Sequence, residues 1–316
     1  MKKDERTIYC YDLAIEASSQ VFKAPKTITV RRAFELMELI SKEQRKKLYH
    51  KGQLLLYVAD WEWKENVISI LVNKSDKSIS DPVFTVPEEG KRRTVAKEAK
   101  EGQDFSAHIV VKLNQNDAIP ALVLIEYCSG LGIAVIEKLF NQILKDSKLL
   151  SPGDFEQAHP DGSVGNDGKP KKLNIIFKCA FQGHLSDELQ DDLNKGKVQS
   201  IELITEKNQF TPFDEDGYIK EKCKSITLTL KDEDRPISDK FKRIVQVFKK
   251  HNNDYSKARI KFKTAEGIDR TVDMDTADGL AQAYVKKARI DGFNGDLESS
   301  YESFNTQILG RMKALV

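Results

Sequence analysis

The chain has 316 residues, of which 40% are hydrophobic and 32% are charged, and its formal net charge at pH 7 is only +2. This length favours two domains over one, and the apolar content is sufficient for packed cores beneath a heavily charged surface. The near balance of charge excludes a globally basic protein, so a binding site for a polyanion must be a local patch.

The first half of the chain predicts a mixture of strands and helices. Short apolar or alternating runs indicate strands at residues 7–12, 53–60, 67–73, 105–113 and 121–125. The second and third of these strands are expected to form a hairpin. Apolar residues at helical spacing predict a helix over residues 29–47, capped by Thr29. Gly130 and Gly132 break the chain before a second expected helix at residues 133–144.

A change in composition follows the second helix. Residues 151–172 are rich in Gly, Pro and Asp and have almost no apolar periodicity, so we expect an exposed linker or long loop there. We therefore place an N-terminal domain at residues 1–150 and a C-terminal domain at residues 173–316.

The second half repeats the mixture of elements. Strands are expected at residues 173–181, 198–204, 225–230, 258–263 and 268–274, and helices at residues 187–193, 239–249, 276–289 and 297–316. The order lacks the regular alternation of a doubly wound sheet. The predicted fold class is therefore α+β, with two mixed α/β domains joined by the Gly/Pro-rich linker and helices at the C-terminal end.

The cysteines and the absence of long apolar runs bear on the compartment. Cys10, Cys128, Cys179 and Cys223 are far apart and form no C-x-x-C pair, so we expect no structural zinc and no cofactor. The sequence shows no apolar signal segment and no stretch near the roughly 18 apolar residues of a membrane-spanning helix. We expect a cytoplasmic protein with reduced cysteines.

A basic segment between Lys240 and Lys263 is the strongest candidate for a binding site. It holds nine basic residues and one acid, Asp254. Apolar residues of the expected helix and strand face a core, so their cations are expected to form one outward surface that contacts phosphate groups. The candidate contacts are Lys242, Arg243, Lys249, Lys250, Arg259, Lys261 and Lys263. The alternative is an ordinary salt-bridged face, in which Asp269 and Asp273 of the partner strand pair with these cations.

A second basic run covers residues 91–100, with the sequence KRRTVAKEAK. We expect it in a loop or short helix between strands. There Lys91, Arg92 and Arg93 would extend a binding track for a polyanion, and the alternative is a solvated loop whose charge Glu98 partly offsets.

The sequence contains no convincing catalytic motif. Gly130-Leu131-Gly132 lacks the rest of a dinucleotide or Walker pattern, so a tight turn is expected there. The Glu-x-Lys triplets at residues 62–64 and 98–100 are expected in a hairpin turn and a charged loop, not in mid-strand, where a nuclease would need them. Acids such as Asp187 and Asp214 are expected on a solvated helix and in a turn, with a nuclease metal site as the alternative. The five histidines have no spacing that implies a catalytic triad.

Several segments carry a family resemblance. They are QLLLYVADW, HIVVKL and PALVLIEYCSGLGIAVIEKLFNQIL in the first half, then FKCAFQGHLSDELQDDLNKGKVQSIELI and a C-terminal helix that ends in Arg311 and Lys313. Their order and local phrasing resemble the RexA-type phage-exclusion proteins of lambdoid prophages and related phage-defence families. The resemblance implies a soluble, dimeric, DNA-binding sensor that acts in abortive infection with a membrane effector protein. The long linker departs from the family pattern, and no contact residue is carried over.

The leading hypothesis is a DNA-binding sensor of a bacterial or prophage anti-phage defence system. Its phosphate contacts would be largely independent of base sequence, because phosphates carry no sequence information. Two alternatives stay open: a metal-dependent nuclease effector of a defence system, and a protein-interaction module whose basic face meets an acidic partner.

Overall fold

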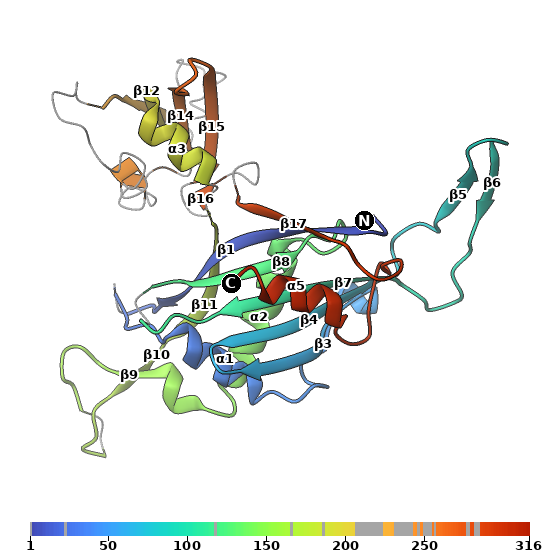
Figure 1. The fold of residues 1–316 in the computed structure, drawn as a ribbon. Coiled ribbons are helices and arrows are strands. Elements are labelled where there is room, and N and C mark those ends of the chain that lie inside the picture. The colour runs from blue at the N-terminus through green and yellow to red at the C-terminus, as the bar shows by residue number, and fades with distance from the viewer. Residues whose placement is uncertain are drawn as a thin grey trace, which may run out of the picture. The chain divides into compact units, whose positions relative to one another are not determined.

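The chain forms two compact units (Figure 1). The computed structural model describes residues 2–21, 24–116, 119–164, 167–184, 187–205, 224–230, 243–244, 247–248, 255, 257–275, 279–280 and 285–316. The first unit comprises Met1–Phe181 and Ala288–Val316, and the second comprises Gln182–Lys287, so the second unit is an insertion in the first. The linker expected at residues 151–172 lies inside the first unit, and the chain enters the second unit only after Phe181.

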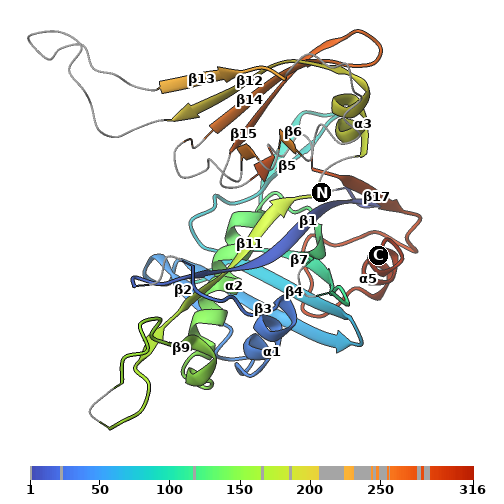
Figure 2. The ribbon, with the colours of Figure 1, turned by 90° about the vertical axis from the view of Figure 1, so that its left-hand side faces the viewer.

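An eight-stranded sheet forms the centre of the first unit (Figures 1 and 2). Its strand order is β11-β1-β8-β7-β4-β3-β2, and β17 also pairs with β1. The pairings from β1 through to β2 are antiparallel. The strands are β1 (Glu5–Ser18), β2 (Lys47–Tyr49), β3 (Leu54–Lys64), β4 (Val67–Asp76), β7 (Gln103–Lys112), β8 (Ala121–Glu126), β11 (Ile176–Gly183) and β17 (Lys287–Asp291).

Helices cover both faces of this sheet. Helices α1 (Val30–Glu38) and α2 (Ile133–Ser147) lie on one face, where the rings of Phe34 and Phe140 pack edge to face with centroids 5.9 Å apart. Helix α5 (Thr306–Lys313) lies on the other face. Its apolar stripe and the strand residues under it form one buried cluster that includes Ile8, Cys10, Val110, Leu124, Ile308, Leu309 and Met312. Burial on both faces explains why the central strands are continuous apolar runs.

The described part of the first unit also contains two small hairpins and two short 3₁₀ helices. They are β5 (Val83–Val86) with β6 (Lys91–Thr94), β9 (Glu156–Ala158) with β10 (Lys172–Asn174), η1 (His50–Gly52) and η2 (Pro152–Phe155). The Gly/Pro-rich stretch expected to be a linker thus contains a 3₁₀ helix and the first strand of a hairpin.

A buried polar network lies between the sheet and the C-terminal part of the chain. Arg6 Nε donates to Glu126 Oε1 over 2.7 Å, and His108 Nδ1 lies 2.6 Å from Glu126 Oε2. All three side chains are at most 1% exposed. The backbone N–H of Asn305 donates to His108 Nε2 over 2.9 Å, so Nε2 is the acceptor and the Nδ1–H donates a hydrogen bond to Glu126 Oε2. Both oxygens of the buried Glu126 carboxylate therefore accept a hydrogen bond, one from Arg6 and one from His108.

The same network explains why residues 297–305 are not helical. The Asn305 N–H bonds to His108, and the Tyr301 N–H donates to Ser106 Oγ over 3.1 Å, so these donors are used by the sheet. The helix expected over residues 297–316 is therefore restricted to Thr306–Lys313, with Asn305 as its N-cap.

Two other expected helices also differ from the structure. Helix α1 starts after the Thr29 cap as predicted, but it ends at Glu38, and residues 47–49 instead form the edge strand β2 beside β3. Within the expected helix at residues 276–289, the described residues 279–280 and 287–289 belong to strands β16 and β17. Pairing with neighbouring strands overrides helical periodicity in the second case. In the first case, residues 39–46 form turns and loop before β2 begins. Among the described helices, none has the length and apolar character needed to cross a bilayer.

The second unit contains a five-stranded sheet with the order β13-β12-β14-β15-β16 (Figure 2). Its elements are α3 (Asp187–Lys195), β12 (Lys197–Thr205), β13 (Lys224–Leu228), β14 (Lys257–Lys263), β15 (Asp269–Asp275) and β16 (Gly279–Leu280). The described residues 243–244 and 247–248 are also helical. Helices and strands thus occur in both units, which confirms a mixed fold, although strands predominate.

The first and last residues of the second unit lie side by side, because residues 183–184 contact residues 285–286. The backbone N–H of Lys286 donates to the carbonyl of His184 over 2.7 Å. Gly183 packs so closely against Val285 that an added Cβ would lie 2.6 Å from Val285 Cγ2. The chain therefore leaves and re-enters the first unit at neighbouring points.

Candidate nucleic-acid interface

Strand β14 separates its cations from its apolar residues by simple alternation. Ala258, Ile260 and Phe262 are buried, whereas Lys257, Arg259, Lys261 and Lys263 lie on the opposite side. We call the side with the cations the outer face of the five-stranded sheet and the buried side its inner face. The predicted strand and its alternation are confirmed.

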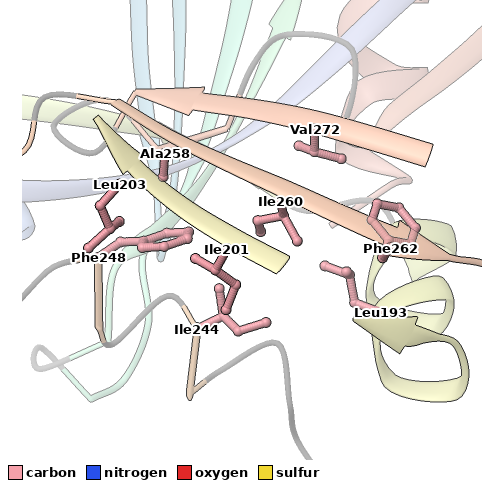
Figure 3. Close-up of a cluster of buried hydrophobic side chains, with 9 residues drawn as sticks. All are labelled: Leu193, Ile201, Leu203, Ile244, Phe248, Ala258, Ile260, Phe262 and Val272. Atoms are coloured by element: carbon pink, nitrogen blue, oxygen red, sulfur yellow. The ribbon is translucent and has the colours of Figure 1, made fainter. Parts of the chain in front are cut away.

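The helical residues pack on the inner face. Ile244 and Phe248 are 2% and 3% exposed and belong to the same buried cluster as Ile260 (Figure 3). Arg243 precedes Ile244 and is exposed, so it lies on the helix side of the sheet. The expectation of one surface shared by helix and strand is therefore wrong. Because the apolar sides of the two elements face each other, their polar sides face away from each other. Lys242, Lys249 and Lys250 lie outside the described residues.

Strand register sets cations of β14 opposite acidic residues at one end of the outer face. Register places Arg259 opposite Glu202 of β12 and opposite Asp273 of β15. It also places Lys257 opposite Asp275. Cross-strand neighbours of opposite charge stabilise a sheet, and this register is the one that the salt-bridged alternative requires.

The other end of the outer face has a surplus of positive charge. Lys197 of β12 is paired in register with Lys263 of β14, and Lys261 follows two residues away on the same face. We call these three residues the lysine corner. All three are exposed, and none forms an ion pair within 4.0 Å with a carboxylate that the structure describes.

Among the described strand partners of the lysine corner, one is an acid. Asp269 is the register partner of Lys263 on β15, and its Oδ1 accepts a hydrogen bond from Gln199 Nε2 over 2.8 Å. Within these register pairings, three cations therefore stand beside one described carboxylate. Two like charges directly opposite each other destabilise a sheet, unless an anion lies between them. This end of the face is suited to bind an anion such as phosphate.

Local geometry brings Lys197 close to Lys263. Gly196 joins α3 to β12, and a Cβ at this position would lie 2.2 Å from the carbonyl oxygen of Lys263 and 2.3 Å from that of Asp192. Only glycine permits this approach of two backbones. A bulge between Val198 and Ser200 follows and adds one residue to the β12 strand.

The first four residues of the second basic run form strand β6, whereas residues 95–100 lie in a loop and turn, as expected. Lys91, Arg92 and Arg93 belong to β6, whose residues are all exposed. Arg93 is the register partner of Phe84, and its guanidinium carbon lies 5.5 Å from the centroid of that ring. Phe84 is itself 55% exposed, so this hairpin presents an aromatic ring and three cations to solvent. Such a combination can stack on bases and contact phosphates.

The structure also places the residues considered for catalysis. Glu62-Trp63-Lys64 lies at the end of strand β3 and not in the turn, which corrects the expectation, and Glu62 Oε2 lies 2.7 Å from Lys313 Nζ. Asp187 begins α3, and Asp214 lies outside the described residues. Across the described part of the chain, no group of three or more His, Cys, Asp or Glu side chains could hold a metal ion.

The Gly130-Leu131-Gly132 segment forms the expected turn between β8 and α2. Gly130 lies against the ring of Phe105, where an added Cβ would be 2.5 Å from Cδ1. Gly132 is the N-cap residue of α2. The glycines are therefore explained by close packing and by the start of a helix.

Sequence reasoning missed Lys197. Its residue type and its position before a predicted strand were visible as Lys195-Gly196-Lys197. Its pairing with Lys263, 66 positions away (263 minus 197), depends on a register that local patterns do not contain.

No protein-family model matches the chain, and neither a curated protein nor a solved structure is significantly similar to it.

Proposed function

We propose that this chain is a DNA-binding sensor of a bacterial or prophage anti-phage defence system. It contacts the phosphate backbone through the lysine corner and binds largely without regard to base sequence. The observation that carries the proposal is the register pair of Lys197 and Lys263 with Lys261 beside it, all exposed and without an ion pair among the described residues. A linear polyanion supplies the counter-charges that this arrangement lacks.

The proposed interface has a second component in the β5–β6 hairpin. Its three cations and exposed Phe84 are suited to a single strand or to the edge of a groove. Arg243 and Arg259 remain candidate contacts, although the first is on the inner side of the sheet and the second faces acids in register. We expect the lysine corner to contribute more to binding than Arg259, because fewer acidic residues lie opposite its cations in register.

The biological setting follows from the resemblance to RexA-type phage-exclusion proteins. We propose a cytoplasmic homodimer that binds DNA and passes the signal to a membrane effector protein, as in abortive infection. The lysine corner belongs to the second unit alone, which supports the proposal that this unit binds DNA and the first unit has another role.

The test is a fluorescence-anisotropy titration of labelled single-stranded and duplex DNA at 25 to 300 mM salt. The variant carries K197Q, K261Q and K263Q. The matched control carries K42Q, K169Q and K171Q, which change the net charge equally at exposed lysines of the first unit. Each neutralised phosphate contributes about −0.9 to the slope of log K against log salt for duplex DNA. Loss of three contacts should therefore reduce the magnitude of the slope by about 2.7, whereas the control should leave it unchanged.

Two results contradict the proposal. One is the absence of binding to any DNA by the unmodified protein at 25 mM salt. The other is an equal salt slope for the lysine-corner variant and the control. Incubation of plasmid with the protein and Mg²⁺ or Mn²⁺, with and without chelator, separates binding from cleavage.

A further inference from the structure

A cavity of about 930 Å³ lies in the first unit, between one side of α2 and the segment that leads into β11. The lining residues of α2 and its C-cap Lys148 begin at Ala134 and recur every three or four positions, so they form one stripe of the helix. Residues 173–178 form the facing wall, and residues 19–21 extend from β1 at its edge. Cavities of this size hold small organic molecules.

The wall opposite α2 is apolar. Phe155 and Phe177 are buried beneath the cavity, with ring centroids 5.3 Å apart. At its edge, Ile176 and Val21 remain 54% and 56% exposed. An apolar ligand body lying here would remove both of these side chains from water, which is favourable.

Lysines dominate the charge of the lining. Lys138, Lys145, Lys148 and Lys178 face a single carboxylate, Glu137, among the described lining residues. This gives a surplus of three positive charges (four minus one). Over the ten positions from Lys138 to Lys148 the helix rises about 15 Å, so the charge is spread along the whole wall.

The four lysines differ in how they are engaged. The ammonium of Lys138 lies 4.2 Å from the centroid of the Tyr49 ring, and Lys148 Nζ donates to Asn174 Oδ1 over 2.9 Å. Lys145 and Lys178 are exposed and form no ion pair with a carboxylate that the structure describes. These two lysines are available to a ligand without loss of an existing salt bridge.

We propose that this cavity binds a small amphipathic anion, with an apolar body and one carboxylate or phosphate head. The body covers Ile176, Val21 and the phenylalanine floor, and the head is neutralised by Lys145 and Lys178. An apolar floor beside unmatched cations favours such a molecule over a neutral lipid or an organic cation. The site belongs to the first unit and does not depend on DNA binding by the second.

Isothermal titration calorimetry with decanoate and decyl phosphate tests the proposal. The comparison ligands are 1-decanol and decylammonium, which share the alkyl chain and lack the negative charge. The variant is K145Q with K178Q, and the matched control is K42Q with K169Q, two exposed lysines that do not line the cavity and that change the net charge equally. All four positions are exposed, so the variants should fold, and tryptophan fluorescence verifies this.

We expect saturable binding of at least one anion, at least about tenfold tighter than of 1-decanol or decylammonium, because contacts with a charged group are worth about tenfold or more. The cavity variant should lose about tenfold or more in affinity, and the control should match the unmodified protein. The relative affinities of decanoate and decyl phosphate identify the preferred head. The proposal is overturned if neither anion binds saturably, if the uncharged or cationic ligands bind as tightly, or if the cavity variant binds like the control.

Discussion

Replacement of Glu126 by alanine should strongly destabilise the first unit. Glu126 Oε1 accepts from Arg6 Nε at 2.7 Å, and its Oε2 interacts with the backbone N–H of His108 at 3.1 Å and with His108 Nδ1 at 2.6 Å. The alanine variant leaves three donors without an acceptor and leaves the Arg6 guanidinium buried without a counter-charge. Removal of one partner of a buried ion pair typically costs about 3–5 kcal/mol.

The two tryptophans of the chain offer a selective assay. Trp61 and Trp63 both lie in β3 of the first unit, so urea unfolding followed by tryptophan fluorescence reports on that unit alone. With a urea m value of about 2 kcal/mol/M, a loss of 3–5 kcal/mol moves the midpoint down by about 1.5–2.5 M. Glu126→Gln should have an intermediate effect, since its amide NH₂ must face one of the donors.

A surface ion pair provides the control for this prediction. Lys3 and Asp296 lie 3.0 Å apart, but their side chains are 79% and 73% exposed. Asp296→Asn should therefore leave the midpoint almost unchanged. If Glu126→Ala lowers the urea midpoint by less than about 0.5 M, the loss of stability is below about 1 kcal/mol at the same m value. The network would then contribute little to stability, and the reasoning would be refuted.

Three further predictions concern pH, close backbone packing and capping. Burial raises the pKa of the Cys179 thiol to about 12 and that of the Tyr11 hydroxyl to about 12. Both groups stay protonated longer in the folded state, so the stability they contribute below pH 9 and pH 10 is lost as pH rises towards 12. The urea midpoint should fall from pH 8 to pH 11, and fall less in Cys179→Val; an equal fall in both proteins contradicts this attribution. Gly196→Ala forces a Cβ against two carbonyl oxygens and should make the second unit more sensitive to limited proteolysis while tryptophan fluorescence is unchanged; equal cleavage rates would oppose this expectation. Asn305→Ala removes the acceptor for Gln307 and Ile308 N–H and should cost about 1 kcal/mol in the urea assay, whereas no change would argue against the cap.

Local sequence patterns predicted the elements whose packing is expressed in their own periodicity. The alternation of β14 gave the correct type of element and the correct buried face, and the helix expected at residues 133–144 is α2. Ile244 and Phe248 also face the core as their spacing indicated. The direction of the helix cations relative to the strand cations was wrong, because it depends on how the two apolar faces meet and not on either pattern alone.

Features set by distant partners could not be predicted. Residues 297–305 follow a helical apolar pattern, but their N–H groups bond to side chains nearly 200 positions earlier, such as His108 and Ser106. The insertion of the second unit likewise depends on the return of β17 to β1, which leaves no local signal. The lysine corner was also not predictable from local patterns, since Lys197 becomes part of it only through its register pairing with the distant residue Lys263.

The late position of helix α5 in the chain has a consequence for biosynthesis. The segment that covers one sheet face and donates to His108 is translated after the whole second unit. Until then, apolar residues such as Val110 and Leu124 lack their cover, and Glu126 lies in an incomplete network. A nascent or prematurely terminated chain that lacks α5 therefore exposes an apolar sheet face. Such a face favours binding by chaperones and degradation of the chain. Full synthesis of the chain, with its inserted unit, precedes closure of the first unit's core.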